Sequence, residues 1–352
     1  MSDDSQWTCP FPISTYPRIT LAHGGGGRLT AQLIEALFQP AFLNPEQECQ
    51  HDGAVLAVES GRLAFSTDSY VVNPLFFSGG DIGALAVHGT VNDLAMCGAR
   101  PRWISCGFIL EEGLPTETLV RVVRSMQEAA RRVGVRIVTG DTKVVERGRC
   151  DGLYLNTTGL GEILREPTPH PSRIQAGDCL LVSGDLGRHG IAVLSQRQGL
   201  AFESPVTSDV GDLSAPVLDL LSQGVEVRAL RDLTRGGLAT ALVELAEASK
   251  QTLMLAESDI EVSESVAGAC ELLGLDPLYV ANEGRCLVVI SQAHAEKALS
   301  ILRSHTISHN ARAIGVVERT PVDGRPRVLA RNSLGTLRGL ERLSGEQLPR
   351  IC

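Results

Sequence analysis

Residues 64–98, AFSTDSYVVNPLFFSGGDIGALAVHGTVNDLAMCG, decide the fold class. The first part of this stretch belongs to a run of β-branched and aromatic residues over 62–72, which predicts a strand. Residues 81–98 carry apolar residues at helical spacing and predict a helix that ends at Gly98. A strand followed closely by a helix is typical of an α/β protein.

The same alternation continues towards the C-terminus. The pattern predicts further strands over 102–110, 135–142 and 153–163, and a helix over 115–134 that begins at a proline. After a connector with three prolines, further strands are predicted over 179–184, 227–232, 286–291 and 311–318. Helices are predicted over 187–199, 236–250, 265–274 and 294–305. The fold class is therefore mixed α/β (α+β), in two lobes.

The length of 352 residues allows each lobe its own core. We divide the chain into four parts: an N-terminal extension (1–19), a first domain (20–165), a second domain (166–320) and a C-terminal tail (321–352). The tail has several Gly, Pro and Arg residues and only scattered leucines, so we expect it to run over the surface.

Composition excludes several classes of protein. The formal net charge is −9 and charges of both signs are interspersed, so a nucleic acid is not an expected partner. The acidic first residues lack a signal-peptide pattern and no apolar run reaches membrane length, which predicts a soluble, cytoplasmic protein that binds no membrane. The nine cysteines form no C-x-x-C pair and no zinc-like spacing, and their odd number fits a reducing compartment.

Four aspartates stand where a predicted strand or helix meets small polar residues: Asp52, Asp68, Asp93 and Asp232. Carboxylate oxygens are suitable ligands for Mg²⁺. Each residue could equally cap a helix or a turn. Asp93 fits that alternative least well, because it interrupts an apolar helical stripe where an unpaired charge would be costly.

Glycine-rich segments supply a second signal. Residues 23–27 precede a helical pattern, residues 140–143 end a predicted strand, and residues 234–237 open another helix with an arginine. Helix N-termini and arginine bind phosphate, so the segments together indicate a nucleoside triphosphate. Neither a P-loop nor a Rossmann fingerprint is present, and a glycine-rich loop alone is more often a turn.

Taken together, the motifs resemble the hydrogenase-maturation carbamoyl dehydratase family, HypE. The resemblance rests on LAHGGGGRLTAQLIEALF, the stretch quoted above, SCGFILEEGLP, IVTGDTKVVERG, ALRDLTRGGLATAL, CELLGLDPLYVANEG and the terminal PRIC. It extends from about residue 20 to the last residue. The wider pattern is similar to aminoimidazole ribonucleotide synthetase, selenophosphate synthetase and thiamine-monophosphate kinase, whose sequences lack the terminal PRIC.

The resemblance implies a two-lobed synthetase fold whose first lobe binds ATP with Mg²⁺ and pairs in a homodimer. The implied nucleotide site comprises Gly24, Gly25, Gly26, Asp52, Thr67, Asp68, Asn92, Asp93, Gly140, Asp141, Thr142, Asp232 and Arg235. The four aspartates are the implied metal ligands. The implied catalytic residues are Cys352, Lys143 and Glu283. His23, His88 and His189 also lie beside or close to glycine, but we interpret them as structural residues.

In this family the terminal cysteine receives a carbamoyl group from HypF. The resulting thiocarbamate is dehydrated to a thiocyanate with ATP, and the cyanide passes to a HypC–HypD complex for the iron centre of a [NiFe]-hydrogenase. The resemblance therefore implies that Cys352 is a tethered substrate on a flexible tail, with Glu283 as the base and Lys143 stabilising developing negative charge. Two other hypotheses remain: a small-molecule ATP-dependent synthetase or kinase of the same superfamily, and a non-catalytic carrier.

Overall fold

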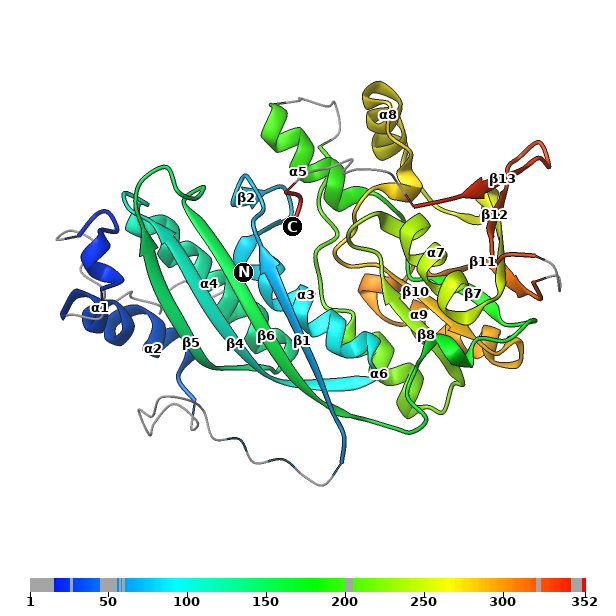
Figure 1. Ribbon diagram of the computed structural model, residues 1–352, viewed down its shortest axis with the longest axis horizontal. Helices are drawn as coiled ribbons and strands as arrows, with labels where there is room; N and C mark the ends of the chain where they lie inside the picture. The colour runs from blue at the N-terminus through cyan, green and yellow to red at the C-terminus, as the bar shows by residue number, and fades with distance from the viewer. Residues whose placement is uncertain are drawn as a thin grey trace.

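The computed structural model describes residues 16–25, 28–44, 56, 58, 61–199, 205–320, 324–342 and 350–352. The described residues form two α/β lobes (Figure 1). None of the helices in these ranges is long and apolar enough to cross a bilayer.

A four-stranded sheet in the order β1-β6-β4-β5 forms the first lobe. Its strands are β1 (Leu63–Tyr70), β4 (Ala99–Glu111), β5 (Arg136–Val145) and β6 (Leu153–Ile163). A hairpin of β2 (Phe76–Phe77) and β3 (Gly80–Asp81) precedes the helices α3 (Ile82–Met96) and α4 (Thr116–Val133). An N-terminal segment adds α1 (Arg28–Leu33), a π-helical turn (Ile34–Phe38) and α2 (Gln39–Phe42).

The helices α3 and α4 cover one face of this sheet (Figure 1). Asp81 begins α3, because its carboxylate accepts hydrogen bonds from the backbone N–H groups of Gly83 and Ala84. Gly134 ends α4 in the left-handed conformation that glycine adopts without strain. The opposite face of the sheet carries exposed side chains, including Phe65 and Ile109.

A seven-stranded sheet in the order β13-β12-β9-β11-β7-β10-β8 forms the second lobe. Its strands are β7 (Cys179–Val182), β8 (Val227–Asp232), β9 (Thr252–Ala256), β10 (Cys286–Ile290), β11 (Arg312–Glu318), β12 (Val328–Arg331) and β13 (Leu337–Leu340). Its helices are α5 (Arg188–Gln198), α6 (Ser214–Ser222), α7 (Gly237–Ser249), α8 (Glu264–Leu273) and α9 (Ala295–Arg303). Short 3-10 turns lie at Leu21–His23, Pro171–Arg173, Glu257–Asp259, Pro277–Tyr279, Gln292–His294 and Thr306–Ser308.

The C-terminal part of the chain differs from the expected surface tail. β12 pairs with β9 in parallel and with β13 in antiparallel orientation, so residues 328–340 extend the sheet of the second lobe. The tail therefore cannot begin at residue 321. Val328, Ala330 and Leu340 are buried against the core, which explains why this short segment with few apolar residues folds.

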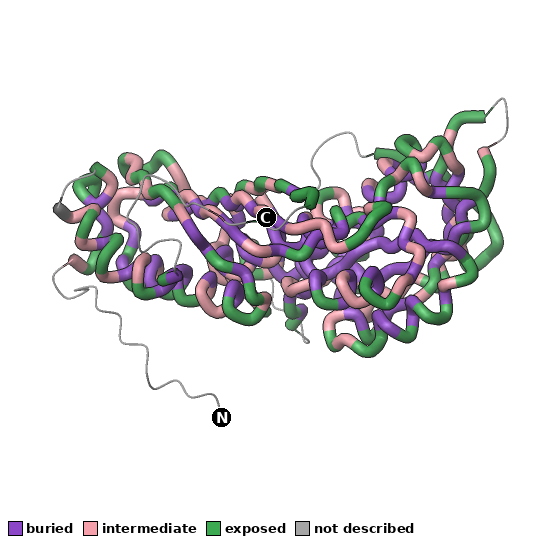
Figure 2. The backbone as a smooth tube through the Cα atoms, turned by 90° about the horizontal axis from the view of Figure 1, so that it is seen from below, coloured by how far each residue is buried: buried purple, intermediate pink, exposed green. Residues whose placement is uncertain are grey.

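The two lobes also meet through buried polar contacts. The side-chain amide of Asn92 on α3 donates to the carbonyl oxygens of Gly211 (3.0 Å) and Glu283 (3.3 Å) and accepts from the N–H of Leu213 (2.8 Å). Asn92 is 2% exposed. These contacts fix α3 against the second lobe at the place where a cavity opens. Buried residues are found along the middle of the molecule (Figure 2).

Candidate active site

A cavity of about 330 Å³ lies between the two lobes. It is lined by Asp68, Ser69, Tyr70, Gly89, Asp93, Arg231, Asp232, Thr234, Arg235, Gly237, Thr240, Ala241, Glu244, Glu283 and Cys352. The cavity thus unites six of the residues that the sequence singled out: Asp68, Asp93, Asp232, Arg235, Glu283 and Cys352.

Three aspartates come from three different elements. Asp68 lies on β1, Asp93 on α3 and Asp232 at the end of β8. The hydroxyl of Ser66 donates to Asp93 Oδ2 at 2.5 Å, and the hydroxyls of Tyr70 and Thr90 lie 3.4 Å from Asp68 Oδ2. The strand and helix therefore converge on one group of carboxylates.

The carboxylates repel one another. Burial, followed by the charge of Asp93, raises the pKa of Asp68 to about 6. Burial, followed by the charges of Asp93 and Asp68, raises the pKa of Asp232 to about 7. Oxygen ligands with excess negative charge suit a divalent cation. Within the described residues, however, no three acidic, histidine or cysteine side chains are close enough to form a complete metal site.

Glu283 lies in the loop Ala281–Gly284, which closes one side of the cavity. Its side chain is buried and its Oε1 atom has no hydrogen-bond partner in the described structure. Burial, followed by the negative charges of Asp232 and Asp209, raises its pKa well above the usual range. Oε1 lies 4.0 Å from His189 Nε2, too far for a hydrogen bond, so this oxygen is available to a molecule bound in the cavity.

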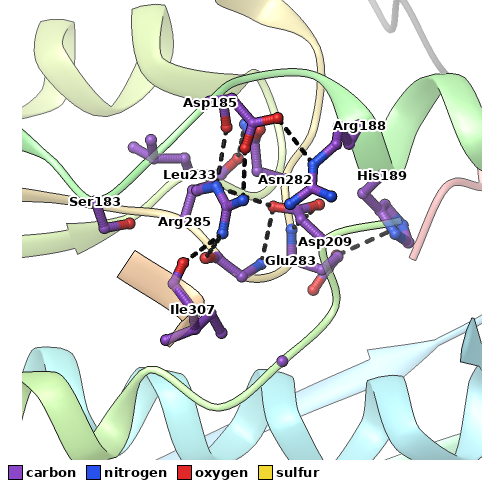
Figure 3. Close-up of polar contacts among 12 residues, drawn as sticks. Ser183, Asp185, Arg188, His189, Asp209, Leu233, Asn282, Glu283, Arg285 and Ile307 are labelled. Atoms are coloured by element: carbon purple, nitrogen blue, oxygen red, sulfur yellow. Dashed lines mark hydrogen bonds and ion pairs between the residues drawn. The ribbon is translucent and has the colours of Figure 1, made fainter. Parts of the chain in front are cut away.

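A dense network holds this loop (Figure 3). Asp209 accepts hydrogen bonds from the backbone N–H groups of Glu283 (3.3 Å) and Gly284 (3.2 Å). Arg285 donates to the carbonyl oxygens of Gly284 (2.8 Å) and Ile307 (3.0 Å) and to the Asp185 carboxylate (2.5 Å). Asn282 Oδ1 accepts a hydrogen bond from the Gly187 N–H at 2.7 Å. The backbone of Glu283 is therefore fixed while its Oε1 atom has no hydrogen-bond partner.

Residues 350–352 lie between the lobes, and Cys352 is at the wall of the cavity. The backbone N–H of Val71 donates to the Cys352 carbonyl oxygen at 3.0 Å, and Ile351 is 3% exposed in the core of the first lobe. Burial, followed by the nearby charge of Glu283, raises the pKa of the Cys352 thiol to about 12. The described tail thus places its sulfur beside Glu283, Asp68 and Arg235.

Two contacts to this tripeptide were not predicted from the sequence. His189 Nε2 lies 2.9 Å from the Ile351 carbonyl oxygen, and Arg197 Nη2 donates to the Arg350 carbonyl oxygen. His189 was interpreted as a structural residue because a histidine beside glycine carries no distinctive signal. Only its burial against a segment 162 positions later reveals the contact.

Lys143 and residues 140–142 lie elsewhere. Gly140, Asp141 and Thr142 line a second cavity of about 180 Å³, between β5 and the N-terminal helices. Lys143 lies on β5, and its side chain is 67% exposed. In the sheet Asp68 pairs with Thr157, which pairs with Cys106, which pairs with Gly140. Three steps between neighbouring strands correspond to roughly 14 Å. Within a single chain, residues 140–143 therefore do not reach the cavity that contains Asp68.

Because side chains alternate along a strand, Asp68 and Thr67 lie on opposite faces of the first sheet. Asp68 points to the α3 side of the sheet, whereas the exposed Thr67 points to the opposite face. The open face therefore carries Thr67, Asp141 and Lys143, with Lys143 Nζ lying 3.7 Å from Asp141 Oδ2.

The other predicted nucleotide residues are placed as follows. A Cβ atom at Gly24 would lie 2.5 Å from the backbone nitrogen of Val144, so the glycine permits close approach to β5. Gly25 is exposed, and Asn92 is bonded to the second lobe as described. Gly26 and Asp52 lie outside the described residues. Gly24 thus lies near the end of β5 and not at the cavity between the lobes.

The two lobes and the cavity between them define an AIR-synthase-related protein. The AIR synthase related protein N-terminal domain matches residues 50–163, and the corresponding C-terminal domain matches residues 175–325. A thiamine-monophosphate kinase of Stenotrophomonas maltophilia has the same fold, with a TM-score of 0.63 at 19% identity, covering 86% of this chain and 95% of that one.

Within this class, the chain belongs to the family of the carbamoyl dehydratase HypE. It is 48% identical to HypE of Cupriavidus necator over 95% of both chains, and 48% identical to HypE of Escherichia coli over 95% of this chain and 99% of that one. A crystal structure of the hydrogenase maturation protein HypE in complex with ATP superimposes with a TM-score of 0.91 at 50% identity, covering 95% of this chain and 99% of that one.

Proposed function

We propose that this protein is an ATP-dependent carbamoyl dehydratase that acts on a carbamoyl group carried by its own Cys352. The product is a thiocyanate that supplies the cyanide ligands of the iron centre in [NiFe]-hydrogenase maturation. One observation carries the proposal: the sulfur-bearing residue lies in the same cavity as a buried glutamate with a free oxygen and a group of carboxylates.

ATP and Mg²⁺ are the proposed cofactors. The residues fit both, because Mg²⁺ needs only one or two carboxylates beside phosphate oxygens and waters, which Asp68, Asp93 and Asp232 could offer, and Arg235 offers a planar cation for phosphate. Asp52, the fourth aspartate that the resemblance implies, lies outside the described residues. When bound, ATP with its metal ion supplies a phosphoryl group that turns the carbonyl oxygen of the thiocarbamate into a leaving group.

Glu283 has the role of base. Removing water from –S–C(=O)–NH₂ to give –S–C≡N requires loss of both N–H protons and of the carbonyl oxygen. Glu283 would take the first proton through Oε1, which increases the nucleophilicity of the carbonyl oxygen. Its raised pKa makes the ionised carboxylate a stronger base than an exposed glutamate. Burial of Ile351 and the loop around Glu283 limits access of water to the reacting group.

We further propose a homodimer formed through the open face of the four-stranded sheet. This face carries the exposed apolar side chains of Leu63, Phe65 and Ile109, which a second subunit would cover. Lys143, Asp141 and Thr67 lie on the same face. Because Lys143 is remote from the cavity of its own chain, we assign it to the cavity of the partner subunit, where its ammonium group would stabilise charge on the transferred phosphoryl group.

The second cavity completes the nucleotide site in this proposal. Phe38, Phe42 and Phe108 give it an apolar wall that suits a flat base, and Gly140 to Thr142 lie at its rim. The adenine would occupy this cavity, and the phosphates would reach the carboxylates of the other subunit across the dimer interface.

HypF is the proposed carbamoyl donor and a HypC–HypD complex the proposed cyanide acceptor. A crystal structure of a HypE–HypF complex superimposes on the chain with a TM-score of 0.77 at 43% identity, covering 88% of this chain and 99% of that chain. The cytoplasm is the proposed location, since a reducing compartment keeps the Cys352 thiol free.

The test is mass spectrometry of the C-terminal peptide after incubation with HypF, carbamoyl phosphate and Mg-ATP. The expected product is the carbamoyl adduct less one water, formed only when ATP is present. A Cys352→Ala protein should form neither adduct. ATP turnover by Cys352→Ala that depends on a diffusible substrate would support the small-molecule synthetase instead, and an adduct that never loses water would contradict the dehydratase.

A further inference from the structure

The tripeptide 350–352 is held by α5 of the second lobe. We propose that His189 and Arg197 form a latch that positions the tail for dehydration by binding only its backbone. This inference rests on the proposed function, because it concerns how the carrier cysteine reaches the cavity.

His189 is the buried part of the latch. Its Nε2 atom lies 2.9 Å from the Ile351 carbonyl oxygen, which only accepts, so Nε2 carries the proton. Its Nδ1 atom lies 2.9 Å from the Ser208 hydroxyl, which donates to it. Phe77 packs edge-on against the imidazole with ring centroids 5.3 Å apart. The ring is therefore held in one tautomer and one orientation, aimed at the tail.

Arg197 lies on the same helix, two turns further along. Its Nη2 donates to the Arg350 carbonyl oxygen and its Nε donates to the Asn73 carbonyl oxygen at 2.6 Å. Asn73 lies three residues after the end of β1. Val71, directly after β1, donates its backbone N–H to the backbone oxygen of Cys352. The tail is thus held between α5 and the end of β1, so the latch connects both lobes through the tripeptide.

None of these contacts involves the sulfur. The latch binds the carbonyl oxygens of residues 350 and 351, the Val71 N–H binds the backbone oxygen of Cys352, and the Ile351 side chain fills an apolar site. The guanidinium group of Arg350 pairs with Asp151. The backbone contacts of the latch are therefore the same for a free thiol, a thiocarbamate and a thiocyanate, while the sulfur faces Glu283 and Arg235. Occupancy of the latch determines how often Cys352 is in the cavity.

The test measures alkylation of Cys352 by iodoacetamide in the full-length protein, read by mass spectrometry of the peptide that follows Glu346. The variants are His189→Phe and Arg197→Met, which remove the donors, and His189→Gln, which retains one. Ser195→Ala is the matched control, because Ser195 lies on α5 and its hydroxyl donates to the Ile191 carbonyl oxygen and not to the tail. Cys97 is exposed and serves as an internal reference, whereas buried Cys106 reports unfolding.

Loss of one neutral hydrogen bond should increase the undocked fraction, and with it the alkylation rate of Cys352, about threefold to tenfold in His189→Phe. Loss of a charged donor in Arg197→Met should increase it about tenfold or more. His189→Gln should restore most of the protection, and Ser195→Ala should match the wild type. If Cys106 becomes reactive in His189→Phe, that variant is unfolding and the test rests on Arg197→Met, because Arg197 is half-exposed and its replacement disturbs the fold less. Wild-type protection of Cys352 in Arg197→Met and in every folded His189 variant would overturn the proposal.

A second measurement separates the latch from the function. With the tail already carbamoylated, the single-turnover dehydration rate of Arg197→Met should fall in proportion to the docked fraction; this variant is used because His189 Nε2 also lies 4.0 Å from Glu283 Oε1. Unchanged dehydration in variants with faster alkylation would overturn the positioning role. If no protein, including the wild type, loses water, the proposed function fails, while the alkylation rates still decide whether the latch exists.

Discussion

Replacing Asp232 with asparagine tests the electrostatics of the cavity. Burial and the charges of Asp93 and Asp68 raise the pKa of Asp232 from 3.8 to about 7. Because the folded-state pKa is the higher one, the native protein retains a proton that the unfolded chain releases. The free energy of unfolding therefore falls as the pH rises between these two values. At about 1.4 kcal/mol per pKa unit, the full cost is about 4 kcal/mol above pH 7.

Without nucleotide or divalent cation, Asp232→Asn should raise the free energy of unfolding by up to about 4 kcal/mol at pH 8 and leave it unchanged near pH 4. Urea unfolding at a series of pH values measures this difference. The control is Glu244→Gln at the rim of the cavity, where Glu244 pairs with a half-exposed Arg231 and a change of no more than about 1 kcal/mol is expected. An Asp232→Asn protein that is less stable than the wild type at pH 8, or a difference independent of pH, would refute the electrostatic reasoning.

Three further predictions follow from buried contacts. Glu283→Gln should slow dehydration of a carbamoylated tail by about 10²-fold to 10⁴-fold while ATP binding is retained. Single-turnover mass spectrometry measures the dehydration rate and calorimetry measures ATP binding. A normal dehydration rate would show that Glu283 is not the base. Gly284→Ala should lower the free energy of unfolding by about 1–3 kcal/mol or more, because the new Cβ would clash with the Asp209 carbonyl oxygen. The control is Gly268→Ala, where a Cβ would meet no atom within 4 Å and should not destabilise the protein. Asn92→Ala should cost about 3 kcal/mol, since three backbone contacts between the lobes are lost; a melting temperature equal to that of the wild type would contradict this assignment.

Local patterns predicted most of the elements. β1 and α3 were predicted because strand alternation and helical spacing follow each other directly, and the structure confirms both. The sequence did not predict α6, a nine-residue helix, or β9. β12 and β13 were missed as well, because strands of four residues depend on pairing partners that are distant in the sequence.

The sequence predicted several side chains of the candidate site, but not how the fold places them. Carboxylates beside small residues pointed to Asp68, Asp93 and Asp232, which the cavity brings together. Asp209 and Arg285 hold Glu283 in place, yet no local motif distinguishes them from other charged residues. Sequence order also could not show that Lys143 lies on the other face of the sheet from Asp68, because that depends on strand register.

The strand β13 shortens the tether of the carrier cysteine. The sheet fixes the chain at Leu340, so twelve residues, 341–352, connect the sulfur to a rigid anchor, where a tail starting at residue 321 would have had thirty-two. Twelve residues reach at most about 40 Å, which limits how far from Leu340 a donor or acceptor can meet the thiol. For a flexible chain, the shorter tether also raises the effective concentration of the sulfur at its own cavity about fourfold. Two short strands at one side of the sheet thereby favour rapid return of the loaded cysteine over long reach.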